Sequence, residues 1–171
     1  NLANLTQVLT CLWKIHQDHP TTKSFQWEKI LQSLRTARGV KKRFEHLGSQ
    51  QDIEVYEDFA HHPTAVQNMI NSLRIQHPKR RLLLAFEPKN ASSRRNIFMN
   101  QYIKTLAQAD LVFIAPCPQD KRIQIENKMN TDELAKQIGE KAAAFSSHEI
   151  LLEDLLSKLQ RGDIIVFMSC G

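Results

Sequence analysis

The stretch Leu82-Leu83-Leu84-Ala85-Phe86 decides the fold, because all five successive residues are apolar. A strand with one face in water alternates apolar and polar residues, whereas a strand covered on both faces is apolar throughout. Two later runs, Leu111–Ala115 and Ile164–Met168, have the same character. Short buried strands of this kind are typical of parallel sheets that carry helices on both faces.

Segments with helical periodicity separate these strands. A β-rich segment, Ile53–Phe59, precedes a helix that we expect to start at Pro63, since proline suits the first helical position. Further helices are predicted at residues 94–108, 130–139 and 150–159. Strand and helix thus alternate about four times. This order predicts an α/β fold with a doubly wound, mostly parallel, Rossmann-like sheet.

Capping signals place the helix boundaries in the C-terminal half. Asn130 with Glu133, and Ser146 with Glu149, have the spacing of capping boxes. Gly162 is expected to close the last helix as a C-cap residue. The segment 141–145 stays open between the end of a helix and a short strand.

The first 45 residues have a different character. Apolar residues recur at helical spacing in 2–15 and again in 27–36, and a basic segment covers 37–45. Because strand and helix alternate only after this opening, we expect a domain boundary near residues 39–48. The absence of an initiator Met leads us to expect that Asn1 lies inside a longer protein.

Composition limits the classes of function. The length of 171 residues suits one domain or one domain with a short appended piece, and 42% hydrophobic residues is typical of soluble globular proteins. The net charge is +5, but Lys and Arg form no stripe interleaved with aromatic residues, which argues against nucleic-acid binding. No apolar run approaches the roughly 20 residues that cross a bilayer. The cysteines (Cys11, Cys117 and Cys170) are odd in number and widely spaced, which favours reduced thiols in a cytosol and disfavours a zinc site.

The predicted strands end in residues that can carry chemistry. In open α/β sheets, ligands bind beyond the carboxyl ends of the strands. At these ends lie Asp58–Thr64, Glu87–Asn90, Pro116–Pro118 and Ser169–Gly171. Acidic, imidazole, cationic and small polar groups therefore meet at one edge of the sheet.

Each of these segments also has an ordinary structural interpretation. His61-His62 could be a turn between strand and helix in which one histidine caps the helix. Lys41-Lys42-Arg43 could be a solvated basic loop, and residues 89–95 a polar loop with a serine cap. A nucleophilic pair of cysteine and histidine is conceivable, but no third group that would orient it is identifiable.

Four segments together resemble a known family. Val55–Ala65 resembles the D-[FY]-[AG]-H-[HT]-P-T segment of the Mur ligases, which form amide bonds in peptidoglycan precursors. About a dozen residues earlier, Gly39–Glu45 resembles the G-x-x-R-R-[FM]-E segment that links their central ATPase domain to their C-terminal domain. Phe86-Glu87-Pro88 and Gly162–Gly171 follow in the order of the family. The resemblance covers about residues 37–171, and the order of four motifs makes it specific.

Within the family, Asp58–Ala65 looks most like the murein peptide ligases, which join UDP-N-acetylmuramate to the recycled murein tripeptide L-Ala-γ-D-Glu-meso-diaminopimelate. The alternative is the UDP-N-acetylmuramate–L-alanine ligases, which usually have Tyr-Gly where this chain has Phe59-Ala60. Glu87-Pro88 agrees with the pattern Glu-Pro-Arg-Ser-Asn-Thr of the peptide ligases. Lys89 replaces the arginine of that pattern, and Asn90-Ala91-Ser92 departs from it, so the contacts to the peptide stay open.

The resemblance implies roles for individual residues. Arg43 and Asp58 match positions that contact the nucleotide ribose, and His61 matches a position between nucleotide and substrate. Contacts to the incoming peptide are expected at His62, Thr64, Lys89, Asn90 and Ser92. No residue is expected to be catalytic or to hold a metal.

The resemblance further implies ATP and Mg²⁺ as cofactors, and activation of a carboxylate as an acyl phosphate. Residues 1–38 would be the helical tail of the central domain, and residues 39–171 the C-terminal ligand-binding domain. No G-x-x-x-x-G-K-[ST] loop occurs in the sequence, so phosphate and Mg²⁺ are expected to be bound by other domains of the same polypeptide.

We therefore expect a fragment of a bacterial cytoplasmic enzyme that binds ligands but does not catalyse alone. Its expected partners are UDP-N-acetylmuramate, the murein tripeptide, ATP and the N-terminal and central domains, without nucleic acid or membrane. The competing hypothesis is a nucleotide-binding α/β module with no ligase activity.

Overall fold

The computed structural model describes residues 2–18, 26–36, 41–118 and 123–169. The chain divides into two compact units, which comprise residues 1–38 and residues 39–171. That the first unit is part of a neighbouring ATPase domain stays a prediction.

The first unit consists of two helices, α1 (Leu2–Asp18) and α2 (Trp27–Thr36), where helices were predicted. The rings of Trp13 and Trp27 lie 5.8 Å apart, so the two helices contact each other. The apolar side chains of this unit are only partly covered, because Val8 and Trp13 are each 53% exposed. Two helices of this size do not bury enough apolar surface to make a stable core of their own.

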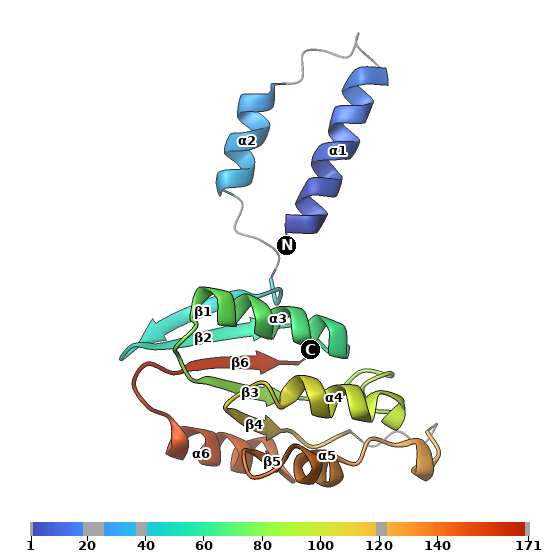
Figure 1. The fold of residues 1–171 in the computed structure, drawn as a ribbon, viewed down its shortest axis with the longest axis vertical. Coiled ribbons are helices and arrows are strands. Elements are labelled where there is room, and N and C mark those ends of the chain that lie inside the picture. Colours follow the sequence, from blue (N-terminus) through green and yellow to red (C-terminus); the bar gives the residue numbers. More distant parts are fainter. Residues whose placement is uncertain (1, 19–25, 37–40, 119–122, 170–171) are drawn as a thin grey trace. The chain divides into compact units, whose positions relative to one another are not determined.

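The second unit is built on one six-stranded sheet (Figure 1). The strands are β1 (Glu45–Gln50), β2 (Ile53–Asp58), β3 (Leu82–Phe86), β4 (Leu111–Ile114), β5 (Ala142–Ala144) and β6 (Ile164–Met168). Their order in the sheet is β1-β2-β6-β3-β4-β5. Only the β1–β2 pair is antiparallel. The predicted α/β fold with a mostly parallel, Rossmann-like sheet is therefore confirmed.

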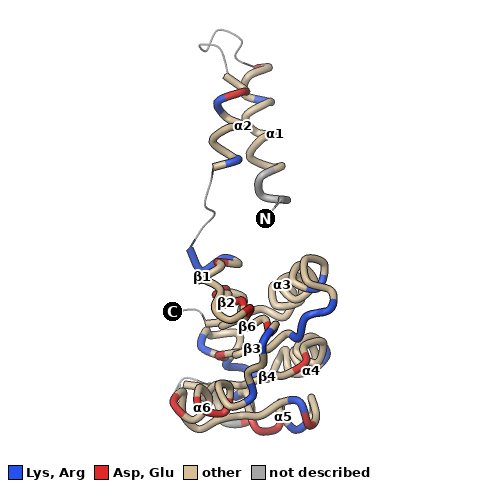
Figure 2. Tube along the Cα trace, turned by 90° about the vertical axis from the view of Figure 1, so that its left-hand side faces the viewer, with Lys and Arg blue, Asp and Glu red and all other residues tan. Residues whose placement is uncertain are grey.

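Helices cover both faces of the sheet, but unequally (Figure 2). On one face lie α3 (Pro63–Gln76), α4 (Met99–Leu106) and α5 (Thr131–Ile138), and on the other lies α6 (His148–Lys158). Two short 3-10 helices, η1 (Asn96–Phe98) and η2 (Ile125–Asn127), lie in the connections.

The continuous apolar runs are explained by burial on both faces. In β3, Leu82, Leu84 and Phe86 belong to the core beneath α3, α4 and α5, whereas Leu83 and Ala85 belong to the core beneath α6. All five side chains are buried. Successive side chains of a strand point to opposite faces, so both faces of β3 require apolar residues.

Strand β1 was not predicted from the sequence, where we expected only a domain boundary near residues 39–48. It forms a hairpin with β2 through a two-residue turn at Gln51 and Asp52, with φ of 52° and 63°. Both residues lie in the left-handed region, as a type I′ turn requires. The turn escapes sequence analysis because such turns usually contain Asn-Gly or Asp-Gly.

Three further predictions on element boundaries need correction. The helix predicted at 94–108 starts only at Asn96, because Arg95 is extended and forms a β-bridge with Lys128. It consists of the 3-10 helix η1 followed by α4. Ser147, not Ser146, caps α6, since the Oγ atom of Ser147 accepts the N–H of Ile150 at 3.3 Å. Gly162 does not close α6, which ends at an extended Leu159.

One predicted boundary is confirmed, and the segment left open between helix and strand is resolved. Asn130 caps α5, and its Oδ1 atom accepts the N–H of Glu133 at 3.0 Å. The open segment 141–145 contains the edge strand β5.

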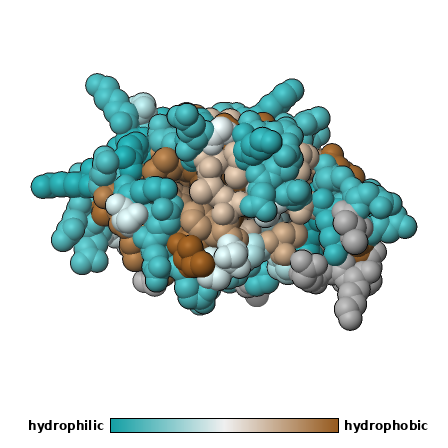
Figure 3. Space-filling model, turned by 90° about the horizontal axis from the view of Figure 1, so that it is seen from below, coloured by the Kyte–Doolittle hydropathy of each residue, from teal (hydrophilic) through white to brown (hydrophobic). Residues whose placement is uncertain are grey.

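Figure 3 views the second unit from below, on the side of β5, and weakly hydrophobic surface occupies the middle of that face between hydrophilic rims.

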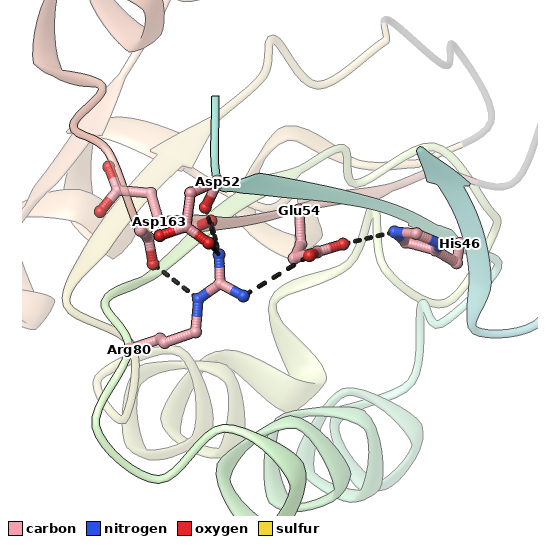
Figure 4. Close-up of polar contacts among 6 residues, drawn as sticks. His46, Asp52, Glu54, Arg80 and Asp163 are labelled. Atoms are coloured by element: carbon pink, nitrogen blue, oxygen red, sulfur yellow. Dashed lines mark hydrogen bonds and ion pairs between the residues drawn. The ribbon is translucent and has the colours of Figure 1, made fainter. Parts of the chain in front are cut away.

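At the N-terminal edge of the sheet, Arg80 ties the β1–β2 hairpin to the start of β6 (Figure 4). Its Nε atom donates to the carbonyl of Gly162 at 2.7 Å, and Nη2 donates to the carbonyls of Asp52 and Asp163. Nη1 lies 3.6 Å from Oε1 of Glu54. Glu54 also pairs with His46 of β1 at 2.5 Å, so one chain of polar contacts spans both strands of the hairpin.

We expect the Arg80→Met substitution to lower the free energy of unfolding by about 2 kcal/mol, since three carbonyl acceptors lose their donor. Urea denaturation of the 171-residue chain, followed by far-UV circular dichroism, measures this difference. The Lys79→Met variant is the matched control, because Lys79 is an exposed neighbour. Equal stability of the two variants would contradict a role of Arg80 in fixing the hairpin.

Asp110 makes stability depend on pH. Partial burial acts to raise the pKa of its carboxyl, but the N–H of Leu82 and the guanidinium of Arg74, each at 2.8 Å, outweigh burial, and the pKa is lowered. A carboxyl with a lowered folded-state pKa stabilises the fold above its unfolded pKa of about 3.9. This contribution is lost as the pH falls through the folded-state pKa.

We therefore expect the difference in unfolding free energy between the wild type and Asp110→Asn to be larger at pH 5 than at pH 3. Urea denaturation at both values measures it. Glu140→Gln is the control, since Glu140 is exposed and should give the same small difference at both pH values. If the difference in unfolding free energy between the wild type and Asp110→Asn does not change between pH 3 and pH 5, the ionisation of Asp110 is not coupled to folding.

Candidate functional site

The predicted functional residues lie at the carboxyl ends of the parallel strands. Asp58 ends β2, Ser169 follows β6, and Glu87 follows β3. Because β6 lies between β2 and β3, these three positions occupy neighbouring places along one edge of the sheet.

The carboxylate of Asp58 is engaged by the backbone. Its Oδ2 atom accepts the N–H of Phe44, and Oδ1 accepts the N–H of Ala60, both at 2.6 Å. The residue is 8% exposed. About four lone-pair sites are present on a carboxylate, so these two bonds use half of them. Asp58 therefore fixes the segment before β1 to the turn after β2.

The segment before β1 adopts a strained backbone that these contacts hold in place. Lys42 and Phe44 have φ of 56° and 54°, in the left-handed region that residues other than glycine rarely adopt. The carbonyl of Lys42 accepts the N–H of Phe59 at 2.7 Å, and its N–H donates to Oε2 of Glu45 at 2.7 Å. Such conformations persist where surrounding contacts determine them.

This geometry presents Arg43 to solvent. Its side chain is exposed, and the guanidinium carbon lies 4.8 Å from the centre of the Phe59 ring. The ring of His61 packs edge-on against the same Phe59 ring, with the two ring centres 5.2 Å apart. Arg43 and His61 thus flank one aromatic ring at the end of β2.

The two adjacent histidines have different roles. Nδ1 of His61 lies 2.9 Å from the carbonyl of Phe59, so this nitrogen carries a hydrogen and Nε2 is the acceptor when the ring is neutral. Nδ1 of His62 accepts the N–H of Thr64 at 3.3 Å and caps α3, so the neutral ring carries its hydrogen on Nε2. The interpretation of one histidine as a helix cap therefore holds for His62. Thr64 lies exposed in the first turn of α3.

Tyr102 stabilises the turn after β2 from the side of the core. Its buried hydroxyl donates to the carbonyl of His61, and its ring packs 5.1 Å from that of Phe86. Burial raises the pKa of the Tyr102 hydroxyl, which therefore stays protonated as a donor.

Glu87 is the centre of a second polar cluster. Its Oε2 atom accepts the hydroxyl of Ser169, and Oε1 lies 3.2 Å from Nε2 of His148 and 4.0 Å from Nζ of Lys89. His148 begins α6, so this helix also contributes to the edge. Sequence reasoning identified Glu87, Lys89 and Ser169 but missed His148, because no motif marks it.

Asn90 and Ser92 form a compact turn. Oδ1 of Asn90 accepts the N–H and the hydroxyl of Ser92, at 3.0 and 2.9 Å, and also the N–H of Ser93 at 2.8 Å. The turn directs the chain away from β3, and the next residue, Arg94, donates its N–H to the carbonyl of Asn90 at 3.0 Å.

Beyond this turn lies a cleft of about 610 Å³, which we call the distal cleft. It lies past the carboxyl ends of β4 and β5, beside the first turn of α5. Its described lining residues include Arg94, Cys117, Lys128 and Asp132. Sequence analysis placed Arg94 in a polar loop and gave Lys128 no role, because the two are 34 positions apart and meet only through folding.

The described residues offer no dedicated metal centre. Among residues 2–18, 26–36, 41–118 and 123–169, no three side chains of His, Cys, Asp or Glu gather closely enough to bind a metal ion. In the same part of the chain, no helix combines the length and the apolar character that a membrane crossing requires.

A mostly parallel sheet with polar groups at its carboxyl edge is the arrangement in which α/β domains commonly bind ligands. Residues 42–171 match the family model of the Mur ligase, glutamate ligase domain, and the chain belongs to this family.

Relatives from two branches of the family are similar to the chain. A UDP-N-acetylmuramate–L-alanine ligase of Desulfitobacterium hafniense (strain Y51) is 31% identical over 147 residues, which cover 84% of this chain and 32% of the relative. The chain thus spans about a third of the length of the curated relatives it matches.

Two solved structures come from the other branch. The murein peptide ligase of Psychrobacter arcticus 273-4 has a TM-score of 0.63 and 25% identity, over 82% of this chain and 29% of that one. A domain assigned to a UDP-N-acetylmuramate:L-alanyl-γ-D-glutamyl-meso-diaminopimelate ligase of Haemophilus ducreyi 35000HP has a TM-score of 0.57 and 28% identity. That match covers 75% of this chain and 89% of the domain.

Proposed function

We propose that the chain is the C-terminal domain of a bacterial cytoplasmic ligase that joins UDP-N-acetylmuramate to the tripeptide L-Ala-γ-D-Glu-meso-diaminopimelate. The reaction uses ATP: the muramate carboxylate becomes an acyl phosphate, and the peptide amine then displaces phosphate to form the amide. The observation that carries the proposal is the carboxyl edge of the sheet. There the Asp58–Thr64 turn, Arg43 and the Glu87 cluster lie at neighbouring strand ends within the region that matches the family.

The end of β2 suits a nucleotide ribose. Arg43 is an exposed forked donor, and Nε2 of His61 accepts from a hydroxyl group when the ring is neutral. The remaining lone pairs of Asp58 can accept from ribose hydroxyls, while its backbone bonds hold Arg43 and His61 in position. Asp58 thus acts both by contact and by positioning.

The end of β3 suits the incoming amine substrate. Lys89 is exposed and supplies a cation for a carboxylate. Thr64 is exposed and can donate a hydroxyl group, whereas His62 acts through its cap of α3. Asn90 and Ser92 act by shaping the turn that carries Lys89, since their polar atoms bond to each other.

Phosphate and Mg²⁺ are assigned to other domains of the polypeptide. The sequence has no G-x-x-x-x-G-K-[ST] loop that would hold the phosphates. The half-exposed apolar residues of α1 and α2 support the assignment of residues 1–38 to the central domain, where further helices or strands would cover them. The 171-residue chain should therefore bind ligands but form no amide.

The second candidate acceptor is L-alanine. The 31% identity to a UDP-N-acetylmuramate–L-alanine ligase favours it, and the 25% and 28% identities to peptide-ligase structures do not distinguish the two acceptors. Glu87-Pro88 follows the peptide-ligase pattern, and this motif decides our choice.

The test uses the full-length protein from which the chain derives. Release of ADP is measured with ATP, UDP-N-acetylmuramate and the tripeptide, and the product is identified by mass spectrometry. We expect ADP release only when all three are present. Nucleotide binding without amide formation from tripeptide or L-alanine would favour the non-catalytic module instead.

A further inference from the structure

Tyr102 of α4 contacts both halves of the candidate site from the interior of the protein. Its side chain is fully buried. The ring packs against Phe86, the last residue of β3, with the two ring centres 5.1 Å apart, and Glu87 follows Phe86 directly. The hydroxyl donates to the carbonyl of His61 in the turn after β2. One side chain thus connects the end of β2 with the end of β3, although β6 lies between these two strands.

The hydroxyl serves a carbonyl that lies outside the hydrogen-bond ladder of α3. His62 is the N-cap of this helix, and its carbonyl accepts the N–H of Val66 at 3.0 Å as the first helical bond. The carbonyl of His61 lies one residue earlier, where the helix provides no N–H for it. Tyr102 therefore supplies the donor from a different helix.

The backbone on the other side of His61 is also held. The N–H of Ala60 donates to Oδ1 of Asp58 at 2.6 Å, and this bond fixes the residue before His61. The Tyr102 hydroxyl fixes the peptide group that follows the α-carbon of His61. Because the imidazole branches from the backbone between these two points, its direction depends on both bonds.

We propose that Tyr102 is a positioning residue, whose hydroxyl fixes the direction of the His61 imidazole and thereby sets the affinity for nucleotide. The inference rests on the function proposed above, in which Nε2 of His61 accepts from the nucleotide. Without the hydroxyl, the turn populates conformations that do not bind nucleotide. The apparent affinity then falls in proportion to the fraction of molecules in the binding conformation. Loss of one neutral hydrogen bond corresponds to a factor of about five.

The two tyrosines of the chain provide a variant and its matched control. Tyr102→Phe removes the hydroxyl and keeps the ring that packs on Phe86, so it separates the hydrogen bond from the packing. Tyr56→Phe removes the same atom from a residue that is also buried. Within the part of the chain that the structure describes, the Tyr56 hydroxyl makes no hydrogen bond, so its loss should not affect the turn.

Hydrogen exchange of the 171-residue chain, followed by NMR, tests the turn without any ligand. We expect Tyr102→Phe to speed the exchange of the Ala60 N–H about fivefold and Tyr56→Phe to leave it unchanged. The N–H of Val166, which is buried in the middle of β6, reports global unfolding. Faster exchange at Val166 with unchanged exchange at Ala60 would show that the hydroxyl stabilises only the core, and would overturn the proposal.

Kinetics of the full-length protein test the effect on nucleotide binding. We expect Tyr102→Phe to raise the KM for ATP about fivefold and to change kcat less than about twofold, because saturating ATP restores the binding conformation of the turn. A contribution to folding alone would lower kcat through the amount of active protein and leave the KM for ATP unchanged. That pattern would contradict a positioning role.

The His61→Ala background shows whether Tyr102 acts through the imidazole. This substitution removes the side chain of His61 but keeps the backbone carbonyl that accepts from Tyr102. We therefore expect Tyr102→Phe to have no further effect on the KM for ATP in this background, whereas independent effects would multiply. An unchanged KM for ATP in His61→Ala, or a further rise of about fivefold in the double variant, would overturn the proposal.

The two assays distinguish this inference from the proposed function. If amide forms but Tyr102→Phe has the KM for ATP of the wild type, the positioning role fails and the ligase function stands. If the full-length protein forms no amide, the ligase function fails, and the exchange rate of the Ala60 N–H still decides whether Tyr102 fixes the turn.

Discussion

Replacement of Asp58 by alanine is expected to lower the free energy of unfolding of the second unit by about 3 kcal/mol. The substitution leaves the N–H groups of Phe44 and Ala60 without their acceptor, and each hydrogen bond to a charged group contributes about 1.5–3 kcal/mol. It also releases the strained backbone at Lys42 and Phe44. The effect should exceed that of most surface substitutions.

Urea denaturation followed by far-UV circular dichroism measures this loss. Tryptophan fluorescence would not, because both tryptophans, Trp13 and Trp27, lie in the first unit. Glu57→Ala is the matched control: its carboxylate is the neighbouring one, and its ion pair with Lys42 at 3.5 Å is partly exposed and should contribute less than about 1 kcal/mol. Similar stability of Asp58→Ala and Glu57→Ala would refute the positioning role.

The stability of Asp58→Ala also determines how a change in its affinity for nucleotide is interpreted. A raised KM for ATP in Asp58→Ala of the full-length protein has two possible causes, a lost ribose contact or a displaced Arg43. Asp58→Asn helps to separate them, since it keeps one acceptor oxygen and should lose less stability. An unchanged KM for ATP in Asp58→Ala would exclude both roles.

The Phe86→Ala substitution is expected to cost about 3–5 kcal/mol, as for large-to-small changes in a packed core. Phe86 is fully buried in the middle of the sheet and packs against Tyr102, whose hydroxyl holds the carbonyl of His61. Its loss should therefore weaken both the core and the turn after β2.

The same denaturation experiment measures this change, and hydrogen exchange at His61 and His62 reports the turn. Ile75→Ala is the control, because Ile75 is 82% exposed and should change stability by less than about 0.5 kcal/mol. A loss below about 1 kcal/mol in Phe86→Ala would mean that the sheet does not depend on this packing.

The inner strands could be predicted from sequence because their burial leaves a local signal. Leu82–Phe86 and Ile164–Met168 are apolar at every position, and neither turn type nor long-range contact is needed to identify them. Strand β1 lacks this signal: Glu45–Gln50 contains one large aliphatic residue, Leu47, and lies at an edge. Its pairing depends on the Gln51-Asp52 turn, whose residues are not those that usually adopt positive φ.

The site was predictable only in its location. Strand order brings Asp58, Glu87 and Ser169 to one edge, and the positions of these residues in the sequence were sufficient to expect this. Hydrogen-bond partners were not predictable, since Phe44 reaches Asp58 across 14 residues and His148 reaches Glu87 across 61. For the same reason, the meeting of Arg94 with Lys128 in the distal cleft follows from tertiary structure alone.

We propose for this domain a ligase that accepts the murein tripeptide, and this preference over L-alanine can be measured. It is tested most directly by competition: the full-length protein receives ATP, UDP-N-acetylmuramate and equal concentrations of tripeptide and L-alanine in one reaction. Mass spectrometry then gives the ratio of the two amide products. We expect the tripeptide product to predominate in the wild type. A product formed mainly from L-alanine would contradict it and place the chain with the UDP-N-acetylmuramate–L-alanine ligases.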